Sequence, residues 1–382
     1  MATYINVHTH IFSINHVPEY VVGQNRWIFP ISVKRFGGIN DWVLTPLMPV
    51  IGLFTKRKSA ARLQTFARLG LATDQADQYQ SLAEYYKGLG HDFRYVVLPM
   101  DMEQMGAGLT ESNLYTQLLD IIEMRQNPEI AHRLIPFVPV DPRRPEFTDG
   151  TAILNFVKHY IEKFGFAGIK LYPALGYFPF DPKLTEMYEW AIEKQIPIMV
   201  HCIQGVIHWQ GSMDNWRSIL SVAEGLEGYQ NDPSWQLLSE KDKTKKREIF
   251  QRNFTQPNNY DVLIKYLRKQ GVPNAEKLKV CLGHFGMDDD KWFNECKNLI
   301  ANYENFYADI SYVVAQEKCK AKLVDVMSSN QFKSKILFGT DFYVVSKEKK
   351  EDEILKIYLE IIKEFSPFAE VNAEKYLKNS IR

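Results

Sequence analysis

Histidine and aspartate side chains at the ends of short apolar runs are the residues of this chain most able to do chemistry. Imidazole nitrogens and carboxylate oxygens bind zinc and similar divalent ions, and both groups can also move protons in catalysis. Five such residues end an apolar run: His8, His10, His201, His284 and Asp341. A metal centre would need all five to meet at one point, so the prediction depends on the fold that positions them.

His8 and His10 form an HxH pair. Residues two apart in a β-strand point to the same face, so both imidazoles could reach one metal ion while Thr9 points away. Each signal is weak when taken alone, because a histidine at a strand end is more often structural and Asp341 could equally cap a helix. Their occurrence together, at the ends of four different runs, is what favours a metal centre.

Eight short apolar runs have the length and the β-branched or aromatic content of buried parallel strands. They cover residues 4–10, 94–100, 134–140, 166–172, 196–202, 278–284, 305–311 and 336–342. Apolar residues also recur with the spacing of one helix face over residues 153–164, 184–192, 260–267 and 354–365. Strands that alternate with helices predict a parallel α/β sheet, and eight such units predict closure into a (β/α)8 TIM barrel.

A closed barrel would bring the C-terminal ends of all strands to one mouth, where barrel active sites form. An open, doubly wound sheet is the alternative, and the lack of a glycine-rich loop after the first run disfavours it. Two connections, about residues 12–92 and 204–258, are too long for a minimal barrel. We expect them to be helical insertions after strands one and five, over the mouth of a single domain that spans residues 1–382.

The composition is that of an ordinary globular protein and points to no polymeric partner. Lys and Arg together number 46, as do Asp and Glu, so no net charge attracts nucleic acid or an anionic membrane. Scattered cysteines without a CxxC pair, an N-terminus unlike a signal peptide and no apolar run of about 18 residues predict a cytoplasmic protein. We expect a small-molecule substrate; the oligomeric state stays open, with a homo-oligomer as one alternative.

The stretches NVHTH, GIKLYP, IPIMVHC, LGHFG, LFGTDF and VNAEKYL occur in this order along residues 4–377. In combination they resemble the amidohydrolase-related branch of the amidohydrolase superfamily, which includes metal-dependent TIM-barrel hydrolases and non-oxidative decarboxylases. The chain departs from the family pattern at Asn6, where the family usually has Asp. It departs again at Phe342 and Tyr343, because a Pro often follows shortly after the Asp of the last strand. These departures leave the subfamily and the substrate open.

The resemblance implies a role for each residue of the centre. His8, His10, His201 and Asp341 would bind one divalent metal ion, with Zn²⁺ as the first candidate and Mn²⁺, Fe²⁺ or Ni²⁺ as alternatives. Asp341 would also accept the proton of the attacking water. His284 would stand beside the ion without necessarily binding it, and would polarise the substrate carbonyl.

Lys170 is the ambiguous residue of this pattern. In GIKLYP it alternates with apolar residues, which predicts that it faces the barrel interior, where an unpaired lysine is costly. It could bind a substrate carboxylate, pair with an internal acid or, like the carbamylated lysine of some superfamily members, bridge two metals. Tyr172, Arg143, His208 and Trp209 are further candidates for contacts with the substrate.

The function predicted from these residues is metal-dependent hydrolysis. A metal-activated water would attack an amide, ester or lactone of a small substrate that carries a carboxylate. A metal-dependent, non-oxidative decarboxylase of a small carboxylic acid is the first alternative, since the same ligands would serve it. A barrel that binds a ligand without catalysis is the second alternative.

Overall fold

Eight parallel β-strands lie side by side in sequence order in the computed structural model of this chain. The structure describes residues 3–18, 72, 74–205, 207–211, 216–287, 289–365 and 368–378. The strands are β1 (Thr3–Thr9), β2 (Asp92–Val97), β3 (Leu134–Pro139), β4 (Gly168–Leu171), β5 (Ile198–His201), β6 (Val280–Gly283), β7 (Phe306–Asp309) and β8 (Ile336–Leu337). Each overlaps its predicted run, so all eight predicted strands are confirmed.

Hydrogen bonds between β1 and the segment around β8 close the sheet into a ring. The backbone N–H of Val7 donates to the Phe338 carbonyl at 2.8 Å, and that of His10 donates to the Phe342 carbonyl at 2.6 Å. In the opposite direction, the N–H of Asp341 donates to the His8 carbonyl at 2.8 Å. The predicted (β/α)8 barrel is therefore confirmed, and an open doubly wound sheet is excluded.

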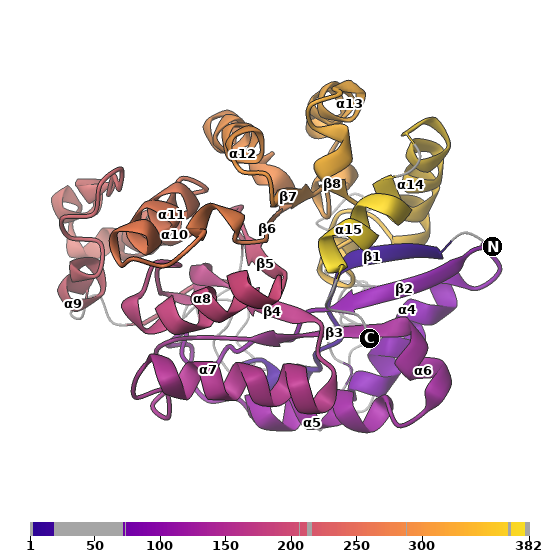
Figure 1. Cartoon of the computed structure of the whole chain (residues 1–382), viewed down its shortest axis with the longest axis horizontal. Helices are drawn as coiled ribbons and strands as arrows, with labels where there is room; N and C mark the ends of the chain where they lie inside the picture. The colour runs from indigo at the N-terminus through magenta and orange to yellow at the C-terminus, as the bar shows by residue number, and fades with distance from the viewer. Residues whose placement is uncertain are drawn as a thin grey trace.

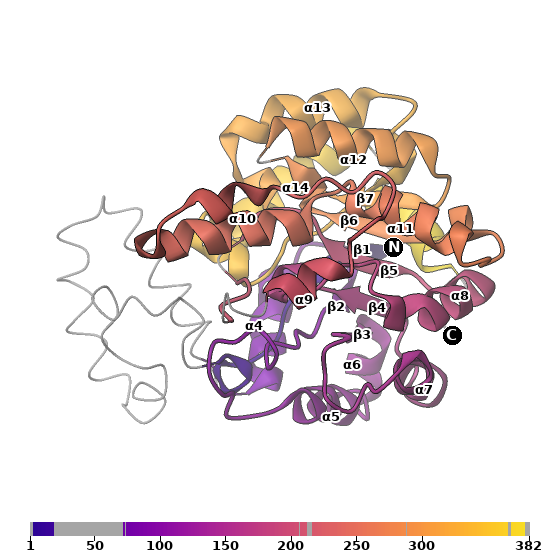
Figure 2. The same cartoon turned by 90° about the vertical axis from the view of Figure 1, so that its left-hand side faces the viewer.

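Helices surround this ring of strands (Figures 1 and 2). They are α4 (Gln75–Tyr86), α5 (Leu114–Met124), α6 (Pro128–Arg133), α7 (Gly150–Lys158), α8 (Thr185–Lys194), α9 (Trp216–Ser221), α10 (Lys243–Thr255), α11 (Asn259–Lys269), α12 (Asp290–Asn302), α13 (Lys320–Ser328), α14 (Glu351–Phe365) and α15 (Ala373–Leu377). The four predicted helix faces fall on α7 with its π-helical continuation His159–Lys163, and on α8, α11 and α14. No helix among these described segments is long and apolar enough to cross a membrane.

Capping side chains explain where several helices begin. The Asn113 carboxamide accepts from the backbone N–H of Thr116 at the start of α5, and the Asp149 carboxylate accepts from Ala152 at the start of α7. Such caps satisfy N–H groups that have no partner within the helix. The two caps thereby fix where α5 and α7 begin, at the ends of the loops that follow β2 and β3.

The predicted insertions are described only in part. Most of residues 12–92 lies outside the described residues; the described part includes a 3-10 turn (Ile14–His16) and α4. Residues 204–258 contain α9, α10 and two 3-10 segments, Pro233–Leu237 and Glu240–Asp242. The placement of both segments as lids over the mouth stays a prediction.

A β-bulge in β1 sets the direction of its histidines. Asn6 pairs with Tyr95 and Thr9 pairs with Val97, so three steps along β1 match two along β2. A bulge of this kind breaks the strict alternation of side chains between the two faces of a strand. Val7 consequently packs in the apolar cluster contributed by the strands and α15, and His8 next to it is also buried, directed to the C-terminal mouth.

A buried polar network ties the closing strands to α4 and α14. Asn6 Oδ1 accepts from the backbone N–H groups of His8 and Thr340 at 3.2 and 3.1 Å. Its Nδ2 donates to Tyr86 Oη at 2.7 Å and to Thr340 Oγ1 at 2.9 Å. Tyr86 in turn donates to Glu351 Oε1 at 2.9 Å. Burial raises the pKa of Glu351 to about 7, against the hydrogen bonds from Thr340 and Tyr86.

The substitution Glu351→Gln should remove a pH dependence of stability. The Glu351 carboxyl ionises near pH 4.5 in an unfolded chain and near 7 in the fold, so folding takes up a proton between these values. The wild-type free energy of unfolding should therefore fall as the pH rises through this window, by up to about 3 kcal/mol. Urea unfolding of metal-depleted protein at pH 5 and pH 8 measures the difference, and the Glu351→Gln variant should lack this fall.

Glu360→Gln provides the matched control, because Glu360 is exposed on the same helix. This variant should keep the wild-type pH dependence. Identical pH dependence in Glu351→Gln and wild type would show that the buried carboxyl does not contribute as described.

Candidate metal centre

Each histidine of the HxH pair is held by one ring nitrogen, which leaves the other directed to the centre. His8 Nδ1 lies 2.9 Å from Asp309 Oδ2, and His10 Nδ1 lies 2.8 Å from the Leu98 carbonyl oxygen. Both acceptors require the hydrogen on Nδ1, so Nε2 of each neutral ring carries a lone pair. These Nε2 atoms lie 3.7 Å (His8) and 3.2 Å (His10) from Asp341 Oδ1.

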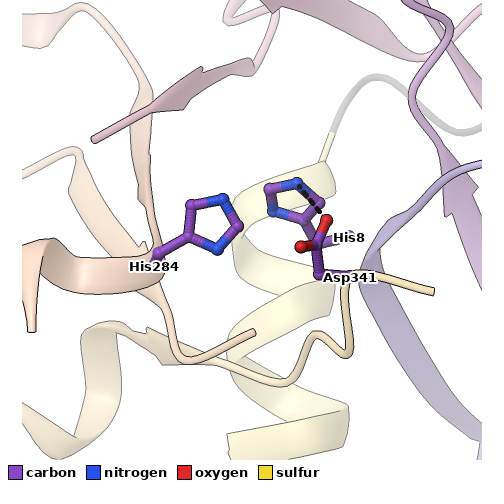
Figure 3. Close-up of side chains that lie close together, drawn as sticks. All are labelled: His8, His284 and Asp341. Carbon is purple, nitrogen blue, oxygen red and sulfur yellow. Dashed lines mark ion pairs between the residues drawn. The ribbon is translucent and has the colours of Figure 1, made fainter. Parts of the chain in front are cut away.

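His284 faces this group from the end of β6 (Figure 3). Its Nδ1 lies 3.2 Å from the Ser311 carbonyl oxygen and 2.9 Å from Ser311 Oγ. A carbonyl can only accept, so Nδ1 carries the hydrogen and Nε2 of the neutral ring is again a lone pair. Ligand atoms of His8, His284 and Asp341 all lie within 4.8 Å of one another. The structure therefore places His284 close enough to His8 and Asp341 for the three to share an ion.

His201 completes the cluster at the end of β5. Its Nδ1 lies 3.1 Å from His284 Nε2, and its Nε2 lies 3.5 Å from Tyr172 Oη. The Tyr172 ring stacks on the imidazole with centroids 4.3 Å apart. Tyr172 thus limits the orientations open to His201, in addition to its predicted contact with a substrate.

Two residues of the cluster adopt backbone conformations that L-amino acids seldom take. His284 and Asp341 both have φ of 63°, in the left-handed region. Such conformations cost about 1–3 kcal/mol each and collect at functional sites, where the surrounding structure holds them. Here the hydrogen bonds from the Asp341 N–H to His8 and from the His284 N–H to Asp309 hold them.

Burial keeps the imidazoles in the form that binds metals. It lowers the pKa of His8 to about 3, despite the opposing charge of Asp309, and it lowers that of His201 well below its usual value. Both rings are therefore neutral at neutral pH, as metal ligation requires. Burial by itself would raise the pKa of Asp309, but His8 and hydrogen bonds from Ser311 hold it below its usual range.

The donor set fits a divalent metal ion. Ligand atoms of His8, His284 and Asp341 lie close enough to share one ion, and His10 and His201 lie beside them, His10 Nε2 at 3.2 Å from Asp341 Oδ1 and His201 Nδ1 at 3.1 Å from His284 Nε2. Mixed nitrogen and oxygen ligands suit zinc, and manganese, iron(II) and nickel are compatible with them. Asp309 and the Leu98 carbonyl are the outer partners that fix ring orientation at such sites.

The cluster opens into a hollow of about 450 Å³ at the C-terminal ends of the strands. His10, His201, His284, Asp341 and Tyr172 line it together with apolar side chains such as Met100, Ile203 and Ile207.

The remaining predicted contacts lie elsewhere. Of the described residues that line the hollow, none is Arg143, His208 or Trp209. Arg143 pairs with Asp141, with Nε 2.9 Å from Oδ1. Trp209 is buried against Phe250, and His208 Nδ1 lies 3.0 Å from the Trp209 carbonyl. Their roles as substrate contacts stay predictions.

Asp309 and Ser311 orient His8 and His284 in the structure. They end an apolar run, where such polar residues are caps, turn residues or outer partners of a site, so the spacing did not separate these roles. The Leu98 carbonyl carries no sequence signal at all, because any residue supplies a backbone oxygen.

Comparison with known proteins agrees with this geometry. The profile of a family described as Amidohydrolase matches residues 124–378. The chain belongs to the amidohydrolase family. No curated protein matches this amidohydrolase in sequence.

Solved structures resemble this amidohydrolase at low sequence identity. A TIM-barrel protein from Bordetella bronchiseptica, itself uncharacterised, is 12% identical with a TM-score of 0.52, over 85% of this chain and 92% of its own. The 5-carboxyvanillate decarboxylase of Novosphingobium aromaticivorans, solved with manganese and 4-hydroxy-3-methoxy-5-nitrobenzoic acid, is 14% identical with a TM-score of 0.47, over 98% and 96%. The 4-oxalomesaconate hydratase of Rhodopseudomonas palustris is 14% identical with a TM-score of 0.46, over the same shares. The Bordetella match supports the fold alone.

Asp309→Asn should weaken metal binding in this amidohydrolase by about 10- to 100-fold, because a neutral amide holds His8 less firmly and makes its Nε2 less basic. Metal content after dialysis against a graded series of chelator concentrations measures the loss. Asp181→Asn is the control, since Asp181 accepts from the backbone N–H of Lys183 and has no contact with the cluster. Wild-type retention of metal by a folded Asp309→Asn variant would contradict the role given to Asp309.

Proposed function

We propose that this amidohydrolase is a metal-dependent hydrolase that cleaves an amide, ester or lactone of a small, carboxylate-bearing substrate. The observation that carries the proposal is the convergence of His8, His10, His201, His284 and Asp341 beside a hollow at the barrel mouth. The position of that hollow at the C-terminal face of the barrel favours a small molecule as substrate.

His8, His10, His201 and Asp341 would hold one divalent ion, with zinc as the first candidate. A bound ion of this kind supplies a Lewis acid and lowers the pKa of a coordinated water toward 7. One ion is enough for these four ligands, so the proposal needs no group that bridges two metal ions.

Asp341 would act as the general base. Its Oδ1 faces the HxH pair, and the residue lines the hollow, so the carboxylate can reach both a ligated ion and a water in the hollow. It would take the proton of the attacking water and pass it to the leaving group. A positioned acid–base residue contributes about 10²- to 10⁴-fold to such a reaction.

His284 would stabilise the negative charge that develops on the carbonyl oxygen. Because its Nδ1–H is used by the Ser311 carbonyl, Nε2 can donate a hydrogen bond only when the ring is protonated. The role as electrophile therefore requires the imidazolium form, whereas the neutral ring is a ligand or a base.

A decarboxylase reaction is the second candidate. The same centre would hold a substrate carboxylate and hydroxyl, and protonated Asp341 would deliver its proton to carbon as carbon dioxide leaves. Burial alone would raise the pKa of Asp341, but the hydrogen bond with His10 and the nearby histidines His284 and His8 hold it below its usual range. The neutral carboxyl that this reaction needs would therefore have to form when the substrate binds. A panel of esters, lactones and amides, set against aromatic carboxylic acids, separates the two reactions.

Asp341→Asn should lower turnover of the best substrate in this panel by at least about 10²-fold, because the amide cannot accept the proton of water. His8→Ala should abolish turnover together with metal binding. Circular dichroism checks that both variants keep the barrel, and Asp149→Asn, which preserves the cap of α7, should retain full activity. Wild-type turnover by Asp341→Asn would refute the mechanism, and a wild-type protein that takes up no metal would leave only a binding barrel.

A further inference from the structure

Lys170 is a fully enclosed charged residue that the proposed chemistry does not use. It lies on β4, in register with Met199 of β5, and its residue exposure is 1%. Its Nζ forms no hydrogen bond with any residue that the structure describes. Two other lysines whose ammonium groups are withdrawn from solvent behave differently: Lys279 donates to the Lys378 carbonyl and Lys335 donates to the carbonyls of Ile300 and Tyr303.

The Lys170 Nζ lies over the Tyr172 ring, 5.5 Å from its centroid, but no acid is hydrogen-bonded to it among the described residues. An enclosed ammonium without a counter-ion is costly, and proteins normally pair such a charge. Burial lowers the pKa of Lys170 to about 8, opposed by the charges of Asp309 and Asp341, so the side chain is still largely protonated at neutral pH. A bound anion would therefore stabilise the protonated side chain of Lys170.

Nearby carboxylates are already committed to other cations or donors. Asp309 accepts from His8 and Ser311, and Asp341 faces the HxH pair. With a divalent ion in the centre, these two carboxylates would balance the ion and leave the charge of Lys170 uncompensated.

The acids on the other side of Lys170 are paired with arginines. Arg144 Nη1 lies 2.9 Å from both oxygens of Asp101, and Arg143 Nε lies 2.9 Å from Asp141 Oδ1. Each of the two acids already has a guanidinium at hydrogen-bond distance, and Arg144 also pairs with Glu103 and Glu146. Neither acid supplies the counter-ion that Lys170 lacks.

Lys170 lines a second, smaller hollow next to the main one. Asp101, Asp141, Leu175 and Tyr177 also line it, and Met100 and Tyr172 line both hollows. The two spaces therefore share a wall, and a ligand that passes Met100 and Tyr172 would reach from the metal centre toward Lys170. This shared wall is apolar and aromatic apart from the tyrosine hydroxyl.

We infer that Lys170 is the anion subsite of the active site and binds the carboxylate of a substrate with an apolar, aromatic body. The group to be cleaved would then lie over the metal centre, on the far side of Tyr172. This assignment rests on the proposed function for the reaction, but the binding of the anion itself needs no turnover. Tyr172 separates the two ends of the substrate and stacks on His201.

Titration calorimetry with benzoate and with benzamide tests the subsite, because the two probes have the same shape and differ in charge. Wild-type protein should bind benzoate at least about 10-fold more tightly than benzamide, which corresponds to about 1.4 kcal/mol. Lys170→Met removes the charge at similar volume and should weaken benzoate binding by a similar factor, with benzamide unaffected. Lys170→Arg should recover part of the affinity, and Lys170→Gln serves if the Met variant does not fold.

Lys279→Met is the matched control, because it removes another buried ammonium, at the start of β6 and away from the mouth. It should leave the benzoate affinity unchanged. Equal benzoate affinity in wild type and Lys170→Met, or no preference of wild type for benzoate, would overturn the assignment. Loss of metal from Lys170→Met would also overturn it, since Lys170 would then belong to the metal site.

A failure of the proposed anion subsite can be distinguished from a failure of the proposed reaction. If no panel compound is hydrolysed while benzoate binding still depends on Lys170, the proposed reaction is wrong and the subsite stands. If a panel compound is hydrolysed but benzoate binds wild type and Lys170→Met equally well, the proposed reaction stands and the assignment of the subsite is wrong.

Discussion

The hydrogen bonds that join β1 to the segment after β8 are the constraint on which the metal centre depends. They connect His8 and His10, at the start of the chain, to Asp341, more than 300 residues later. The same closure places the polar network of Asn6 between the two segments. Without these hydrogen bonds the HxH pair would not lie next to Asp341. The other strands would then contribute only His201 and His284 to the metal centre.

The outer hydrogen bonds decide what the closed barrel can hold. Asp309, the Leu98 carbonyl and Ser311 each take an Nδ1–H, and they come from β7, from the segment after β2 and from the segment after β7. The consequence is that Nε2 of His8 and of His10 face Asp341, while Nε2 of His284 faces His201. Burial keeps His8 and His201 neutral, so the centre attracts a metal ion more strongly than protons.

Charge distribution connects the metal centre to substrate choice. The carboxylates on one side of the barrel face the centre, and on the other side Asp141 and Asp101 pair with Arg143 and Arg144. Lys170 lies between these groups, and its ammonium has no hydrogen-bonded partner among the described residues. Membership in the amidohydrolase family agrees with an enzyme whose centre holds a metal ion. In the hydrolysis proposed here Asp341 would take a proton from water, whereas in a decarboxylation it would give a proton to carbon.

Much of this protein could be predicted from its sequence, because the informative signals are local. Short apolar runs that alternate with helix patterns predicted all eight strands, and ligand-type residues at the ends of those runs predicted which side chains would meet at the mouth. Only the tertiary structure decided that the bulge between Asn6 and Thr9 lets Val7 and His8 both be buried, that Asp309 orients His8, and that Lys170 has no hydrogen-bonded acid beside it. These features depend on register, on closure and on backbone carbonyls from other strands. A periodic pattern along one chain segment contains no information about which atoms of a distant segment will lie opposite it.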